Sequence, residues 1–284
     1  MSGLDLAQLG HAGDFGALAH YADPAYYAKA YRSRRQDVAY YVALAERVGG
    51  PLLEYAIGDG RVALPLARAG HEVWGVDLSA PMLAALEQRL SKETPEVRRR
   101  LHLARGDMRR WRTRRRFPLI ISAFNSVLHL YTRDDVEAFF RRVQAHLAPG
   151  GRFVFDFSLP RPQDLALEPG RNYSRMRLRD PASGKLVKYS ERFEYDPVRQ
   201  IQLCWMQFEP LDGSEPWAIP LTHRQFFPQE MEALLHYAGF RGIEFSADFE
   251  HAPLTVDSDW VVVSCRAPQR RRARAAKKVD ERRR

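Results

Sequence analysis

The sequence predicts an α/β fold, a doubly wound, seven-stranded and mostly parallel sheet with an inserted antiparallel β subdomain. Residues 52–77, LLEYAIGDGRVALPLARAGHEVWGVD, form an apolar strand, a glycine turn, a helical stretch and a second apolar strand. Apolar stretches of strand length then alternate with helical stretches as far as residue 157, and two more strand-like stretches follow near the C-terminus. This alternation is typical of βαβ units, whose strands lie side by side in a parallel sheet.

The turn after the first strand points to a nucleotide-like ligand. Gly58 and Gly60 stand where backbone must turn tightly or approach a ligand closely, which a Cβ would obstruct. With Ala63 they also satisfy the G-x-G-x-x-G/A pattern of NAD enzymes, so the glycines alone do not identify the cofactor. The carboxylate of Glu54 would repel a pyrophosphate but attract a cationic amino-acid ligand. Asp77, at the end of the second strand, stands where a ribose presents its hydroxyls.

This stretch resembles motif I of the class I S-adenosylmethionine-dependent methyltransferases, in which an acid precedes alternating glycines; here Ala56 replaces the first glycine. The family's later segments follow in its order, as DLSAPML at 77–83, GDM at 106–108, AFNS at 123–126 and LAPGG at 147–151. The resemblance covers residues 20–160 well and the C-terminal strands more loosely. It implies a Rossmann-like methyltransferase fold with S-adenosyl-L-methionine as cofactor.

The resemblance also implies which residues bind that cofactor. Leu78 and Met82 would contact the adenine face, and Asp107 would receive the adenine amino group. Small-molecule members close an N-terminal helix over the cofactor and use a tyrosine there, although a tyrosine face at helical spacing is also explained by core packing. The expected cofactor-binding residues are Tyr27, Tyr31, Glu54, Ala56, Gly58, Gly60, Asp77, Leu78, Met82, Asp107, Met108, Phe124 and Asn125.

Methyl transfer from a sulfonium mainly requires that the acceptor is aligned and water excluded, with a base only for an acceptor that arrives protonated. His129 is the candidate base because it follows the fourth strand at the carboxyl edge of the sheet, and Tyr131 lies two residues further on. A histidine between two leucines is also explained as a packed or capping residue. Further candidates for the acceptor pocket are Arg35, Tyr189, Arg192, Trp205 and His223.

Four parts are expected along the chain. These are an N-terminal helical lid (1–48), a cofactor-binding core (49–159 and 223–266), an antiparallel β cap for the substrate (160–222) and a disordered basic tail (267–284). The cap is predicted from alternating apolar runs that turn sequences interrupt. It resembles the subdomain that covers the active site in methyltransferases acting on sugars and other small metabolites.

The net charge of +9 is concentrated in two segments. Residues 98–116 hold ten arginines and one aspartate, and residues 266–284 hold ten basic and two acidic residues, so the remainder is acidic. Both segments could contact phosphates, which leaves an RNA- or ribosome-directed methyltransferase as one alternative. A non-catalytic cofactor-binding module is a second. The motifs of base-modifying enzymes, N/D-P-P-Y/F or a Pro-Cys nucleophile, do not follow the fourth strand, which favours an O or N acceptor on a small molecule.

Composition sets the remaining expectations. The two cysteines are too few for a disulfide framework or a zinc site, so no metal is expected. No apolar run reaches the length of a membrane span, and the N-terminus lacks the layout of a signal peptide. We therefore expect a cytoplasmic protein without a membrane partner, either a monomer or a homodimer.

Overall fold

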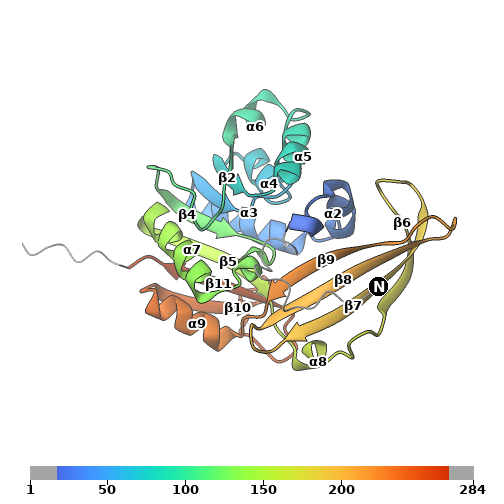
Figure 1. Cartoon of the computed structure of the whole chain (residues 1–284). Coiled ribbons are helices and arrows are strands. Elements are labelled where there is room, and N and C mark those ends of the chain that lie inside the picture. The colour runs from blue at the N-terminus through green and yellow to red at the C-terminus, as the bar shows by residue number, and fades with distance from the viewer. Residues whose placement is uncertain (1–17, 269–284) are drawn as a thin grey trace, which may run out of the picture.

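The computed structural model describes residues 18–268 and contains two separate sheets (Figure 1). The expectation of a disordered tail therefore falls, from residue 269 onward, outside the described residues, as does the first part of the expected lid. Within residues 18–268, no helix is both long and apolar enough to cross a bilayer.

The larger sheet has seven strands in the order β10-β11-β5-β4-β1-β2-β3. Its strands are β1 (Leu52–Tyr55), β2 (Val73–Asp77), β3 (Leu101–Arg105), β4 (Phe117–Ser122), β5 (Leu147–Ser158), β10 (Arg241–Ala247) and β11 (Trp260–Arg266). Strands β1 to β5 pair in parallel, whereas β11 pairs antiparallel with both β5 and β10. The predicted fold class is confirmed. β5 begins at Leu147, which pairs with Phe117 of β4.

Helices cover both faces of this sheet (Figure 1). One apolar cluster joins the sheet to α7 (Arg133–His146) and α9 (Pro228–Tyr237), and a second joins it to α3 (Gln36–Val48), α4 (Ala63–Arg68) and α5 (Ala80–Leu90). A short helix, α6 (Pro95–Arg100), precedes β3. A capping box begins α7: the Thr132 side chain accepts from the Asp135 N–H, and the Asp135 side chain accepts from the Thr132 N–H.

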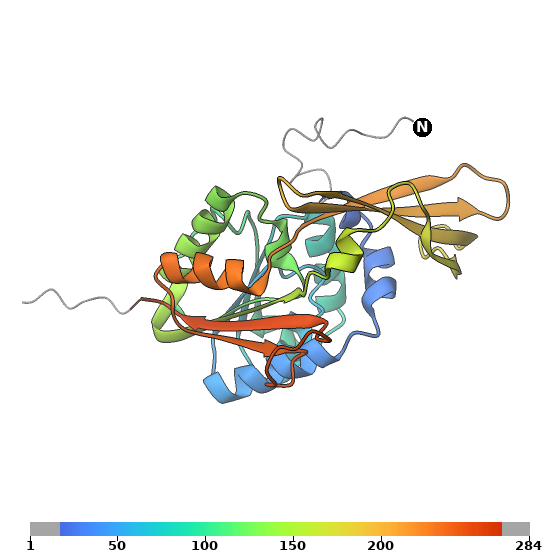
Figure 2. The same ribbon diagram turned by 90° about the horizontal axis from the view of Figure 1, so that it is seen from below.

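The smaller sheet is an antiparallel meander in the order β6-β7-β8-β9. It comprises β6 (Tyr173–Arg179), β7 (Leu186–Asp196), β8 (Ile201–Pro210) and β9 (Trp217–Arg224), and the short α8 (Pro162–Leu165) leads into it. Figure 2 shows it projecting to one side of the core. Helix α2 (Pro24–Tyr31) packs on this sheet, where the ring of Tyr26 meets the edge of Phe208 at 5.3 Å between centroids. The N-terminal segment and the smaller sheet therefore contact each other directly.

Candidate functional site

A cavity lies at the carboxyl ends of β1, β2 and β4, the edge where open α/β sheets bind ligands. The N-terminal segment closes one side of it through Tyr21 and Tyr27. Predicted site residues that line the cavity are Tyr27, Glu54, Ala56, Gly58, Asp77, Leu78, Met82, Asp107, Met108, Phe124, His129 and Tyr131. Tyr31, Gly60 and Asn125 are not among the lining residues.

Glu54 brings a buried carboxylate to this cavity. The residue is only 2% exposed, and its Oε2 makes no hydrogen bond to any residue that the structure describes. Burial raises the pKa of this carboxyl well above its usual value, Arg61 opposes the shift, and the neighbouring acid Asp77 adds to it. A buried carboxylate without a partner is costly, so this position favours a ligand that brings a cation or hydrogen-bond donors.

The loop after β1 adopts an unusual backbone conformation. Ala56 has φ +56° and Gly58 has φ +57°, both in the left-handed region. The Gly58 N–H donates to Asp77 Oδ2 at 2.7 Å, and the Ser79 N–H donates to Asp77 Oδ1 at 2.8 Å. Asp77 therefore holds the glycine loop in place. Asp77 also lines the cavity, at the end of β2 where a ribose is expected.

Gly60 has a different reason to be glycine from the one that we expected. Its φ is +77°, and a Cβ built on it would lie 2.3 Å from Cδ1 of Leu86 in α5. The position therefore needs glycine for its backbone conformation and for close packing of the loop against α5. Close approach to a ligand, which the motif implied, is not required to explain it.

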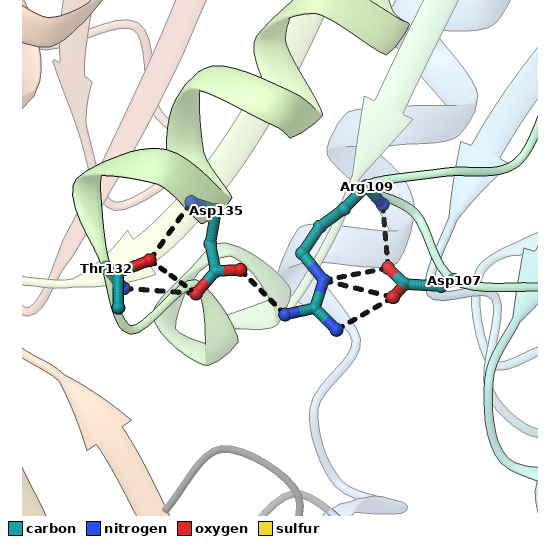
Figure 3. A network of polar contacts seen from close by, with 4 residues as sticks. All are labelled: Asp107, Arg109, Thr132 and Asp135. Atoms are coloured by element: carbon teal, nitrogen blue, oxygen red, sulfur yellow. Dashed lines mark hydrogen bonds and ion pairs between the residues drawn. The ribbon is translucent and has the colours of Figure 1, made fainter. Parts of the chain in front are cut away.

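Asp107 is held by an arginine from the basic segment 98–116 (Figure 3). The Arg109 guanidinium bonds both carboxylate oxygens of Asp107 and also reaches Asp135 Oδ1 at 2.7 Å. Burial alone would raise the pKa of Asp107, but the hydrogen bonds from the Arg109 side chain and backbone outweigh it, and this pKa lies below its usual value. The network ties the loop after β3 to the capping box of α7.

The turn after β4 contains two consecutive left-handed residues, Phe124 at φ +58° and Asn125 at φ +62°. Asn125 does not face the cavity; its Oδ1 accepts from the Ser158 N–H at 2.7 Å. The Phe124 ring lines the cavity, and the ring of Tyr31 packs edge-on against it at 4.8 Å between centroids. Tyr31 thus supports the cavity wall from behind, and its hydroxyl pairs with His20 Nε2 at 3.2 Å.

His129 is enclosed by hydroxyl groups. Nε2 lies 2.9 Å from the Tyr21 hydroxyl, and Nδ1 lies 3.1 Å from the Tyr131 hydroxyl. Burial lowers the pKa of His129 to about 3, with a smaller contribution from His20. An imidazole with so low a pKa is neutral near pH 7 and accepts protons poorly, which favours a hydrogen-bonding role over the general base that we expected.

The further acceptor-pocket candidates lie elsewhere. Arg35, Tyr189, Arg192, Trp205 and His223 do not line the cavity. Tyr189 lines a separate hollow on the smaller sheet. The His223 ring, from β9, packs against that of His129 at 5.0 Å between centroids, so the smaller sheet reaches the rear of the site.

The lining residues that were not predicted from the sequence include Tyr21, Arg61 and Arg109. Arg61 follows the last glycine of the motif and Arg109 is two residues from Asp107, so proximity could have indicated both. Tyr21 carries no such signal, because its partner His129 lies 108 positions away.

Comparison with known proteins agrees with this geometry. The family described as "Methyltransferase domain" matches residues 52–151, the stretch that contains β1 to β4 and the cavity loops. The chain is also similar to the solved structure of the CcbJ methyltransferase from Streptomyces caelestis, with a TM-score of 0.71, 27% identity, and coverage of 82% of this chain and 90% of that one. Residues 52–151 therefore match a methyltransferase domain, and the fold agrees with that of a solved methyltransferase.

Two further similarities concern methyltransferases with named acceptors. A dTDP-3-amino-3,4,6-trideoxy-alpha-D-glucopyranose N,N-dimethyltransferase from Streptomyces venezuelae is 30% identical over 128 residues, which are 45% of this chain and 51% of that protein. The solved glycopeptide N-methyltransferase MtfA shows 25% identity and a TM-score of 0.57, covering 81% of this chain and 90% of that one. The chain spans about half the length of the curated relatives that it matches.

The residues around the cavity fit the family's cofactor, S-adenosyl-L-methionine. Its α-ammonium group would find a counter-charge in the Glu54 carboxylate, whose Oε2 has no hydrogen-bond partner among residues 18–268, and the Gly58 backbone leaves room for a close approach. Met82 and Met108 supply apolar surface for a planar ring. Among the described residues, no group of three potential ligands could hold a metal ion.

Proposed function

We propose that this methyltransferase transfers the methyl group of S-adenosyl-L-methionine to an amine or hydroxyl of a small molecule. The observation that carries the proposal is the buried carboxyl of Glu54, whose Oε2 has no hydrogen-bond partner among the described residues, in a cavity at the carboxyl ends of the parallel strands. The names of the relatives support a sugar or glycopeptide amine as the acceptor class.

In this proposal, the chain binds, orients and desolvates the reactants. The cofactor supplies a methyl group already activated by the adjacent sulfonium charge. Glu54, Asp77 and Asp107 hold its polar ends, while Tyr21 and Tyr27 from the N-terminal segment exclude water from the cavity. Exclusion of water strengthens these electrostatic contacts and favours in-line displacement. Residues 18–48 act as the lid, and residues 160–222 act as the cap for the acceptor.

The basic segment 98–116 supports a small-molecule acceptor over RNA. Several of its arginines bond within the protein: Arg109 to two aspartates, Arg100 to the Ala67 carbonyl, Arg115 to Glu72 and Arg116 to the Leu147 carbonyl. An arginine engaged in this way contributes less to phosphate binding, because its internal bonds would have to be exchanged.

The test is a transfer assay with dTDP-3-amino-3,6-dideoxyglucose as the probe acceptor. Mass spectrometry should detect the acceptor with one and two added methyl groups, and S-adenosylhomocysteine should form in proportion. Gly58→Val serves as the control, because a branched side chain in the left-handed region beside Met82 should prevent cofactor binding. Calorimetric binding of S-adenosylmethionine without methylation of this probe would overturn the acceptor class, and absence of binding would overturn the whole proposal.

A further inference from the structure

Four residues from three parts of the chain form a continuous chain of hydrogen bonds behind the cavity. Tyr21 comes from the N-terminal segment, His129 and Tyr131 from the end of the 3₁₀ turn Ser126–His129 and the residues after it, and Thr222 from β9. The Tyr21 hydroxyl lies 2.9 Å from His129 Nε2, and His129 Nδ1 lies 3.1 Å from the Tyr131 hydroxyl. The Tyr131 hydroxyl in turn contacts the carbonyl of Thr222 at 3.1 Å and its Oγ1 at 2.8 Å.

One assignment of protons satisfies all of these contacts at once. A carbonyl oxygen can only accept, so the Tyr131 hydroxyl donates its one proton to Thr222. The same hydroxyl must then accept from His129, which places the imidazole proton on Nδ1. A neutral imidazole protonated on Nδ1 has an unprotonated Nε2, and Nε2 must accept from the Tyr21 hydroxyl.

In this assignment, the Tyr21 hydroxyl donates its proton to His129. Toward the cavity that Tyr21 lines, its phenolic oxygen can therefore only accept hydrogen bonds. We propose that Tyr21 contacts the methyl acceptor, its oxygen accepting a hydrogen bond from an amine N–H while His129 and Tyr131 act as positioning residues that fix the direction of the Tyr21 hydroxyl. This inference rests on the proposed methyl transfer and narrows its acceptor to an amine.

An amine fits this arrangement better than a hydroxyl because a neutral amine attacks with its own lone pair. As the N–C bond forms and the methyl C–S bond breaks, the bonding pair passes to sulfur, and the product nitrogen carries the positive charge. Its N–H stays on the Tyr21 oxygen, and the proton is lost to water after release. A hydroxyl would have to lose its proton during attack, and the weakly basic His129 behind Tyr21 does not favour that transfer.

The bond directions can be tested on the full-length protein without any ligand. In a ¹⁵N-histidine spectrum assigned by loss of the signal in His129→Gln, we expect His129 to show a protonated Nδ1 and an unprotonated Nε2. In Tyr131→Phe, the fixed tautomer should give way to a mixture of the two. A His129 protonated on Nε2 in the wild-type protein would overturn the proposal, whatever the acceptor proves to be.

The contact with the acceptor can be tested by turnover of dTDP-3-amino-3,6-dideoxyglucose. Tyr21→Phe keeps the ring that packs against His129 but removes the oxygen, and kcat should fall about 10–100-fold while the affinity for S-adenosylmethionine changes less than about twofold. Tyr40→Phe, which removes a tyrosine hydroxyl in α3 that does not line the cavity, should leave turnover unchanged.

Two substitutions of His129 separate positioning from base catalysis. In His129→Gln the amide oxygen can take the place of Nε2 and still receive the Tyr21 proton, so turnover should stay within about threefold of wild type. His129→Leu removes that acceptor, so its turnover should fall as far as that of Tyr21→Phe. Wild-type turnover in Tyr21→Phe, or equal loss in both His129 variants, would overturn the proposal. A wild-type protein that methylates no amine probe but keeps the predicted tautomer would instead refute the proposed acceptor class.

Discussion

Both carboxylate oxygens of Asp156 accept the backbone N–H of Phe124, at 3.0 and 2.9 Å. Asp156 lies in β5, 32 residues after Phe124, and is fully buried. Its Oδ1 also accepts from the Tyr41 hydroxyl of α3 at 2.6 Å. The carboxylate therefore joins α3 and β5 to the left-handed turn that carries the Phe124 wall of the cavity.

Asp156 should make the stability of the protein depend on pH. Burial raises its pKa to about 6, against the opposing hydrogen bonds from Tyr41 and Phe124. Below about pH 4 the group is neutral in both the folded and unfolded states; between about pH 4 and pH 6 only the folded state keeps the proton. As pH rises through this window, the cost of the buried charge should lower the free energy of unfolding by roughly 3 kcal/mol.

The measurement is urea denaturation of the wild type and of Asp156→Asn at pH values from roughly 3.5 to roughly 7.5, a range that includes both pKa values. The variant cannot ionise at this position. As pH rises, its free energy of unfolding should therefore increase relative to that of the wild type. A difference that stays constant over the range would mean that Asp156 carries its charge without penalty.

Gly60 should tolerate a side chain less well than Gly49, although the two have similar backbone conformations. Their φ values are +77° and +79°, but a Cβ at Gly60 would lie 2.3 Å from Leu86, whereas a Cβ at Gly49 meets nothing within 4 Å. Gly49→Ala should cost about 1 kcal/mol of unfolding free energy from the left-handed backbone alone. Gly60→Ala should cost a further 1–3 kcal/mol or so because of the clash.

A double-mutant cycle isolates this clash. Leu86→Ala alone should be destabilising, because it leaves a cavity at a fully buried position. Combined with Gly60→Ala it removes the colliding methyl, so the double variant should be more stable than the sum of the two single losses by about 1–2 kcal/mol. Strictly additive losses would show that the loop can move away from α5.

The fold class, and which residues would lie at the carboxyl edge of the sheet, could be predicted from the sequence because both follow from local patterns. Apolar runs of strand length and helical periodicity indicate the elements, and parallel connection then brings the ends of β1, β2 and β4 to one edge. Residues at or just beyond the ends of those strands, such as Glu54, Asp77 and Phe124, are therefore placed together by the topology itself.

The residue roles that could not be predicted from the sequence depend on contacts between segments that are far apart in the chain. Gly60 is glycine because Leu86 of α5 approaches it, and Tyr21 reaches His129 only once the N-terminal segment folds over the core. Ala56 adopts a left-handed φ that its residue type does not favour, and only the surrounding loop imposes it. No spacing in the sequence encodes these contacts.

Arg109 should anchor the loop that carries Asp107. Arg109→Gln leaves two partly buried carboxylates, Asp107 and Asp135, without their shared cation, so the pKa of Asp107 should rise toward its ordinary value. We expect a loss of about 1–2 kcal/mol of unfolding free energy and weaker cofactor binding. Arg114→Gln, an exposed position in the same basic segment, is the matched control and should change neither. Identical behaviour of the two variants in chemical denaturation and calorimetry would show that the network contributes nothing.

Binding of S-adenosylmethionine should release a proton from Glu54. In the free protein, burial keeps this carboxyl protonated to a higher pH than an ordinary glutamic acid. A bound ammonium group favours the ionised form and lowers the pKa again, so at a pH between the two values up to about one proton leaves per cofactor bound. The binding enthalpy should then depend on the ionisation enthalpy of the buffer, which titrations in phosphate and in Tris would reveal.

Glu54→Gln tests the assignment of that proton. The variant cannot ionise, so the buffer dependence should disappear, and the affinity should fall about 10–100-fold with the lost charge-assisted hydrogen bond. Glu72→Gln removes a carboxylate outside the cavity and should keep both the proton release and the affinity. If Glu54→Gln releases the proton as the wild type does, the group that titrates on binding is another one, and the cationic end of the cofactor does not lie against Glu54.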